Sequence, residues 1–200
     1  MKKLSLAALV LASASVFAAP LRIVNVNAPA VNHVFEPSGV VTVTDYTAPI
    51  WTNGFLQSRY YRSSAASPAA GKYVYEYRVD LREVVGVLSI PYISTLTIDF
   101  GPTSPLDFNG DGRSDDVFVT TTGGLGTIGL ASAVRTGNHI TFTFTSPISG
   151  GGHPHAGTSS FFFGLVSPYA KRSTTATTTN SPGPNLSLTV TSPRYLRRFP

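Results

Sequence analysis

Alternation of apolar and polar side chains with a period of two constrains this chain more than any other feature. Residues 72–80 place three tyrosines and a valine on one face and charged side chains on the other. Residues 139–145 repeat the pattern with Ile140, Phe142 and Phe144 on the inner face. Such a period is that of a β-strand with one buried and one solvated face. After the first twenty residues no amphipathic helix of ten residues stands out, so the sequence predicts an all-β fold.

Further strands are predicted from similar alternation and from runs of β-branched and aromatic residues. They cover residues 21–27, 39–45, 55–61, 84–89, 93–100, 117–121, 126–134, 160–166 and 186–191. About ten short strands separated by turns rich in glycine and proline are typical of an antiparallel β-sandwich, and a β-barrel is the alternative fold.

The N-terminus has the pattern of a secretory signal peptide over residues 1–18. Lys2 and Lys3 precede a short apolar run, and small residues follow up to the expected cleavage site after Ala18. The apolar run is too short to span a bilayer, and we predict no transmembrane segment. The chain has no cysteine, which excludes disulfides and thiolate chemistry. We therefore expect a secreted protein at the cell surface or in the extracellular space.

The C-terminal part differs in composition from the rest. We expect the β-sandwich domain at residues 19–170, a linker rich in Ser and Thr at 171–185, and a strand with a basic tail at 186–200. This flexible arm would fold back onto its own sheet or add to the edge of a neighbour, giving self-assembly through the C-terminal strand.

The charge distribution limits the class of partner. The formal net charge is +5, but all 10 acidic residues precede residue 171 and the arm carries only basic ones. A domain without surplus positive charge is not expected to bind nucleic acid. The basic arm suits acidic surfaces, and we expect surface polysaccharide or other envelope proteins as partners.

The strongest chemical signal is an acidic loop at residues 107–116, Asp-Phe-Asn-Gly-Asp-Gly-Arg-Ser-Asp-Asp. Oxygen atoms at alternate positions around a glycine turn are what a hard cation such as Ca²⁺ requires. The expected ligands are the side chains of Asp107, Asn109, Asp111 and Asp115, with the carbonyl of Arg113. We expect Ca²⁺ to be a structural cofactor, and the alternative is a polar hairpin turn that needs no ion.

The residues after the loop distinguish it from an EF-hand. The last ligand of an EF-hand is a glutamate, but this position is Phe118, and β-branched residues surround it. The acidic loop is therefore expected to lead into a strand.

Two stretches resemble known families. Residues 106–117 look like the calcium loop of FG-GAP/VCBS-type, integrin-like extracellular repeats. Together with residues 157–167, they also resemble the secreted β-domains of bacterial PEP-CTERM-type or choice-of-anchor surface proteins. The resemblance implies a structural calcium ion and a place on a bacterial surface. The C-terminus departs from that pattern, because no apolar span precedes Arg197 and Arg198.

Two other groups of residues suggest alternative functions. Trp51, Tyr60 and Tyr61 would stack on sugar rings in a carbohydrate-binding module, or would simply fill the core. His153 and His155 lie one residue apart in a glycine-rich loop and would serve a copper or zinc enzyme, or would be ordinary polar loop residues.

No hydrolase motif is present, and nothing nominates a pair of catalytic carboxylates. The sequence thus favours a non-catalytic, calcium-stabilised structural or interaction protein of a bacterial cell surface or extracellular matrix, not an enzyme.

Overall fold

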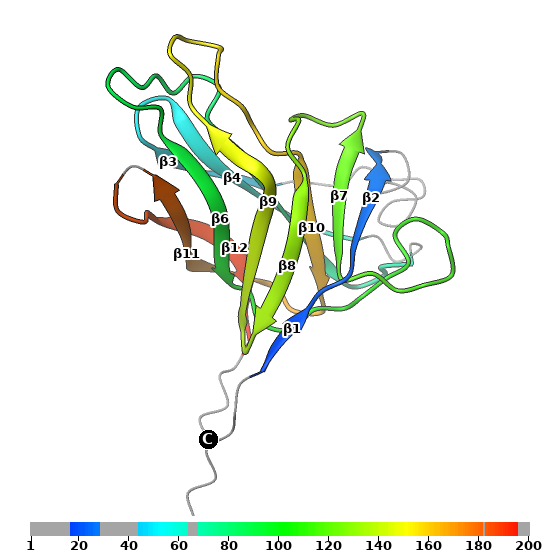
Figure 1. Cartoon of the computed structure of the whole chain (residues 1–200). Helices are drawn as coiled ribbons and strands as arrows, with labels where there is room; N and C mark the ends of the chain where they lie inside the picture. Colours follow the sequence, from blue (N-terminus) through cyan, green and yellow to red (C-terminus); the bar gives the residue numbers. More distant parts are fainter. Residues whose placement is uncertain (1–16, 29–43, 64–67, 182, 196–200) are drawn as a thin grey trace, which may run out of the picture.

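Two six-stranded sheets face each other in a β-sandwich that is not closed into a barrel (Figure 1). The computed structural model describes residues 17–28, 44–63, 68–181 and 183–195. Sheet A contains, in spatial order, β1 (Ala18–Pro20), β8 (Leu130–Thr136), β9 (His139–Ser149), β6 (Tyr92–Asp99), β11 (Lys171–Ser181) and β12 (Ser187–Pro193). Sheet B contains β2 (Ile23–Asn27), β7 (Val117–Thr122), β10 (Phe162–Ser167), β5 (Tyr73–Asp80), β4 (Gly54–Arg62) and β3 (Thr44–Ile50). The predicted fold class is confirmed.

All neighbouring strands run antiparallel except β2 and β7, which are parallel. The inner faces of the two sheets form the main core, to which strands on both sides contribute buried aromatic and aliphatic side chains. Phe142 of sheet A and Phe163 of sheet B pack with ring centroids 4.9 Å apart. In the described part of the chain, no helix is long and apolar enough to cross a membrane.

The tyrosines of β5 fasten the two sheets together. The rings of Tyr75 and Tyr77 are fully buried, yet both hydroxyl groups reach backbone carbonyls. Tyr75 donates to the carbonyl of Tyr169 at 2.8 Å, and Tyr77 donates to that of Thr191 at 2.7 Å. A buried phenol contributes apolar area without leaving its polar atom unsatisfied, so this period-two run both fills the core and holds β12 over it.

A second, smaller core lies on the outer face of sheet B. It consists of Val26, Tyr61, Ala69, Val74, Phe108, Phe118 and Val166. Phe108 comes from the acidic loop, and its ring packs 5.0 Å from that of Phe118 on β7. The loop is therefore anchored to the sheet by an aromatic contact that depends on a residue between its acidic positions.

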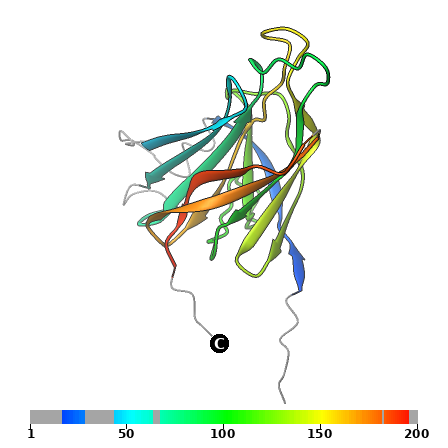
Figure 2. The same cartoon turned by 90° about the vertical axis from the view of Figure 1, so that its left-hand side faces the viewer.

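The C-terminal part differs from the sequence prediction. Residues 171–181 of the expected linker form β11, which pairs with β6 on one side and β12 on the other. Exposed and buried positions alternate along this threonine-rich segment, as they do in a strand. Thr175, Thr177 and Thr179 are exposed, whereas Ala176 and Thr178 are buried. The predicted C-terminal strand folds back onto its own domain as β12, the edge strand of sheet A. It packs against β3 and β4 of sheet B (Figure 2).

Other differences concern short segments. The strand expected at 84–89 is a loop between β5 and β6, and β1 was not expected at all. The strand expected at 126–134 begins only at Leu130 as β8. Most of the strand expected at 39–45, most of the signal peptide and the basic tail at 196–200 lie outside the described residues. The expected cleavage after Ala18 falls within β1, where Ala18 pairs with Thr136.

Gly164 provides a test of the packing between β10 and its neighbours. A Cβ atom at this position would lie 2.5 Å from the Phe118 ring and 2.6 Å from the Tyr75 carbonyl oxygen. We expect Gly164→Ala to lower the free energy of unfolding by about 1–3 kcal/mol, as overpacking in a core does. Gly129→Ala is the matched control, because its nearest neighbours would be at ordinary contact distances of 3.9 and 4.0 Å. Urea titration measures both, and equal stabilities would contradict this packing.

Candidate functional site: an acidic loop and a polar groove

The acidic loop is closed by the backbone and held by its own side chains. Leu106 and Asp115 exchange two backbone hydrogen bonds of 3.0 and 2.8 Å at its neck. Asp107 lies at the centre, where Oδ1 accepts from the amides of Gly110 and Asp111 and Oδ2 accepts from that of Gly112. The two glycines have φ values of 78° and 81°, a left-handed conformation that favours glycine.

The side chains of Asn109 and Asp111 also accept hydrogen bonds from the backbone of the loop. Asn109 Oδ1 accepts from the amide of Asp111 at 3.1 Å, and Asp111 Oδ1 accepts from that of Arg113 at 2.8 Å. Hydrogen bonds from the Asn109 side chain and the Arg113 backbone lower the pKa of Asp111, so the charged carboxylate is favoured. A carboxylate oxygen that accepts one hydrogen bond retains a lone pair for another partner.

Asp115 differs from the other loop residues because its side chain is completely buried. Neither of its carboxylate oxygens accepts a hydrogen bond within the described structure. Arg22 Nε lies 2.6 Å from Oδ1, an ion-pair contact without hydrogen-bond alignment. Burial raises the pKa of Asp115, and the charge of Arg22 opposes this effect. Arg22 is the cation that reaches this carboxylate, but Oδ2 is left without a partner among the described residues, and a buried oxygen without a partner is costly.

Arg22, just before β2, ties the loop to sheet B. Its guanidinium contacts Asp111 at 3.4 Å as well as Asp115, and its backbone amide donates to Asp116 Oδ2 at 2.9 Å. Its carbonyl accepts from the amides of Asp116 and Val117. The side chain is partly exposed, so a positive charge lies between two of the loop's carboxylates on a group with access to solvent.

No group of three or more histidine, aspartate or glutamate side chains in the described ranges is placed to hold a metal ion. The loop aspartates are thus separated in this arrangement, with Arg22 between two of them. His153 and His155 do not converge either. His155 bonds to Glu83 Oε1 at 2.6 Å, whereas the His153 ring lies 2.9 Å from the carbonyl oxygen of Pro154.

The three aromatic residues expected to stack on sugars lie in different environments. Trp51 is 37% exposed at the turn between β3 and β4. Tyr60 faces the main core and stacks on Tyr73 at 5.5 Å, while Tyr61 is buried in the outer core of sheet B. The structure does not bring the three rings together on one surface.

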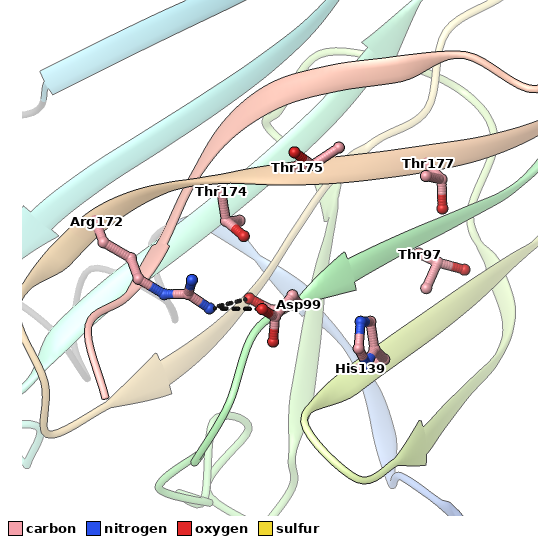
Figure 3. A pocket seen from close by; sticks show the side chains of 7 residues that line it. All are labelled: Thr97, Asp99, His139, Arg172, Thr174, Thr175 and Thr177. Atoms are coloured by element: carbon pink, nitrogen blue, oxygen red, sulfur yellow. Dashed lines mark hydrogen bonds and ion pairs between the residues drawn. The ribbon is translucent and has the colours of Figure 1, made fainter. Parts of the chain in front are cut away.

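No spacing in the sequence indicates the polar groove that lies beside β11. Its first part has a volume of about 370 Å³ and is lined by Thr97, Asp99, His139, Arg172, Thr174, Thr175 and Thr177 (Figure 3). Its second part has a volume of about 330 Å³ and is lined by Tyr46, Lys171, Arg172, Ser173 and Thr191. Arg172 belongs to both, so we treat the two parts as one polar groove.

Threonine hydroxyls extend from the polar groove across the outer face of sheet A. Thr97 on β6 lies opposite Thr141 on β9 and Thr177 on β11, and the hydroxyls of Thr97 and Thr141 are 2.9 Å apart. Two residues along, Thr95 bonds to Thr179 at 2.8 Å. Only adjacency between strands reveals these rows, which is why no spacing in the sequence indicates them.

The two basic side chains of the polar groove, Arg172 and Lys171, have different partners. Arg172 is fixed by Asp99, with Nη2 3.0 Å from Oδ2, and by the carbonyl of Pro193. Lys171 instead contacts the Tyr46 hydroxyl, and its ammonium lies 4.6 Å from the centre of that ring. None of the ion pairs in the described structure joins Lys171 to a carboxylate.

No protein-family model matches the sequence, and no curated protein or solved structure matches it either.

Glu76 on β5 makes the stability of the fold depend on pH. Burial raises the pKa of this carboxyl from 4.5 to about 7, against the opposing charge of Arg59 and a hydrogen bond from Tyr61. Asp45, also near it, adds to the rise. Because the folded state holds this proton more tightly than the unfolded chain, the contribution to stability is complete below pH 4.5 and is lost as the pH rises through about 7.

We expect Glu76→Gln to remove that pH dependence, because the amide carries no ionisable proton. The variant should exceed the wild type in stability above about pH 7, by up to about 3 kcal/mol. Denaturant titrations at several pH values between 4 and 9 measure the difference. A wild-type protein whose stability increases over this window would contradict the assignment.

Proposed function

We propose that this protein is an exported, Ca²⁺-stabilised β-sandwich that acts by contact, as a non-catalytic component of a cell surface or extracellular matrix. The observation that carries the proposal is the completely buried carboxylate of Asp115, which is paired with the partly exposed Arg22, has one oxygen without a partner in the described part of the chain and belongs to an acidic loop rich in oxygen ligands. A divalent cation would satisfy that carboxylate and neutralise its neighbours.

The residues that would hold the ion are Asp107, Asn109, Asp111, Asp115 and the carbonyl of Arg113. All of their donor atoms are oxygen, the type that Ca²⁺ and Mg²⁺ prefer, and the two left-handed glycines allow the tight backbone. Anchoring by Phe108 means that order in the loop is transmitted to β7 through Phe118. The ion would therefore stabilise the sandwich rather than signal its own concentration.

Arg22 would compete with the ion. Its guanidinium now provides the positive charge that Asp111 and Asp115 share, and its partly exposed side chain can move into solvent when a cation arrives. Removing Arg22 should therefore destabilise the ion-free protein and increase the stabilisation by calcium.

We expect Ca²⁺ to raise the unfolding free energy of the wild type. With a dissociation constant of about 10⁻⁴ M, about 10 mM Ca²⁺ would add about 2.7 kcal/mol. Asp111→Asn, which keeps the acceptor oxygen but removes the charge, should reduce the gain, and Arg22→Gln should enlarge it. Thermal unfolding with Ca²⁺, with Mg²⁺ and with a chelator measures each effect.

Two results would contradict the calcium proposal. The first is identical melting of the wild type with Ca²⁺ and with chelator. The second is an Arg22→Gln variant that is destabilised and does not respond to Ca²⁺, which would identify the loop as a turn neutralised by arginine alone.

We further propose that the partner is an acidic polysaccharide bound along the polar groove. Lys171 offers a charge that is not paired with a carboxylate, the Tyr46 ring is partly exposed beside it, and the threonine rows offer hydroxyls that match those of sugars. An aromatic ring beside a cation and a hydroxyl row fits the apolar face, the carboxylate and the hydroxyls of a uronate unit.

We expect the protein to bind a polyuronate and to leave uncharged dextran unbound. Lys171→Met should weaken binding by about tenfold or more, and Lys171→Arg should retain most of it, because loss of a charge-assisted contact is worth roughly 1.5–3 kcal/mol. Affinity electrophoresis or calorimetry at two salt concentrations measures the effect, which should diminish at high salt.

Lys72→Met is the matched control, since it removes the same charge from a residue that does not line the polar groove. Equal losses in the two lysine variants would show a dependence on net charge alone and would overturn the assignment of the groove.

A further inference from the structure

The loop between β5 and β6 exposes aliphatic side chains that the fold does not use. Val87 is 91% exposed and Leu88 is 100% exposed, and Val85 and Ile90 are about half exposed beside them. Single exposed aliphatic residues are ordinary, but four within six residues concentrate exposed apolar area on one loop, and such a concentration marks an interaction site. We call residues 84–91 the apolar loop.

The apolar loop is held in a defined conformation. Its base is bonded to the glycine-rich segment before His153, by Gly86 N to Gly151 O at 2.9 Å, Gly151 N to Val84 O at 2.8 Å and Gly150 N to Pro91 O at 2.9 Å. Val84 is buried in the main core. These contacts fix both ends of the apolar loop that carries Val87 and Leu88. A fixed loop loses less conformational entropy when its side chains make a contact.

Other exposed apolar residues lie at the same end of the sandwich. Trp51 is in the turn between β3 and β4, and a Cβ atom on Gly54 after that turn would lie 2.6 Å from Val84. Leu125, half exposed, is in the loop between β7 and β8, which both views place at this end with the apolar loop (Figures 1 and 2). An aliphatic tip beside an amphipathic indole is the composition of an interfacial membrane contact.

The apolar loop carries no charge of its own, although charged residues flank it. No charged residue occurs between Glu83 and Asp99 in the sequence. Arg82 pairs with Asp80 at 2.7 Å, and Glu83 contacts His155 at 2.6 Å. Because residues 84–91 contain no charged side chain, the apolar loop can enter a medium of low dielectric constant without burying a charge, which suits the interface of an uncharged, zwitterionic bilayer.

The shape of the tip argues against a second copy as the occupant. Two tips in contact would bury only a few side chains, far below the roughly 1,200 Å² that a stable protein interface requires. A fluid lipid interface closes around a convex tip of any shape. We propose that the apolar loop inserts into the interface of a zwitterionic lipid bilayer, with Leu88 and Val87 as the deepest residues.

The chain's single tryptophan gives a direct probe of this insertion. The protein, secreted by its expression host and checked for its processed N-terminus, is mixed with phosphatidylcholine vesicles and with vesicles that also contain phosphatidylglycerol. We expect it to float with both kinds of vesicle, with a blue shift of Trp51 fluorescence. Leu88→Ser should lower the partition coefficient by roughly tenfold or more, because a leucine side chain leaves the interface.

Tyr169→Ser is the matched control, since it removes an exposed apolar side chain from the loop between β10 and β11 and should leave flotation unchanged. The proposal is overturned if the wild type stays in the aqueous fraction with both kinds of vesicle, or if Leu88→Ser floats as well as the wild type. Dimerisation in light scattering that depends on Leu88, without flotation, would also overturn it in favour of self-association. The test is independent of calcium and polysaccharide binding.

Discussion

The complete burial of Asp115 is the constraint on which the acidic loop depends. Its backbone closes the neck of the loop with Leu106, and its side chain is completely buried. The only charge within ion-pair distance of this carboxylate among the described residues is Arg22, which is shared with Asp111. A fold that buries a carboxylate in this way is stabilised by whatever cation reaches it.

The aromatic contact of Phe108 turns this local constraint into a property of sheet B. A loop of acidic and glycine residues has little apolar surface with which to pack, but Phe108 lies on the outer face of β7 against Phe118. Repulsion among the carboxylates would therefore act on a packed segment rather than on a free one. This arrangement explains why a cation in the loop would contribute to global stability.

The sequence predicted strands best where one face is apolar and the other is polar. β5 and β9 have that pattern, and both lie in the interior of their sheets. The prediction of strands failed for β11, because threonine occupies both faces of this strand and the residue type alone does not indicate which positions are buried. The prediction failed in the opposite sense at residues 84–89, where an apolar run predicted a strand but Val85, Val87 and Leu88 are exposed and only Val84 is buried.

The candidate sites were predictable to different degrees for a related reason. The acidic loop is contiguous, so residue spacing alone identified its oxygens, whereas Arg22 comes from a distant segment and no spacing could assign it to the loop. The polar groove joins β3, β6, β9, β11 and β12, and only the order of strands in the sheets brings its residues together. Residues 171–175 and Thr177 line the groove because the expected linker is the strand β11.

The proposed contacts occupy separate parts of the sandwich, and this separation determines how they would act together. The polar groove lies along β11, whereas the apolar loop and the turn between β3 and β4 lie at one end of the sandwich (Figure 1). Each contact involves few side chains and would be weak alone. A molecule held at a lipid interface by its tip would present the groove to polymer at a high effective concentration, so weak binding at both sites would reinforce retention at a surface. The acidic loop takes part in neither contact, and its cation would act only through the stability of the body that carries both.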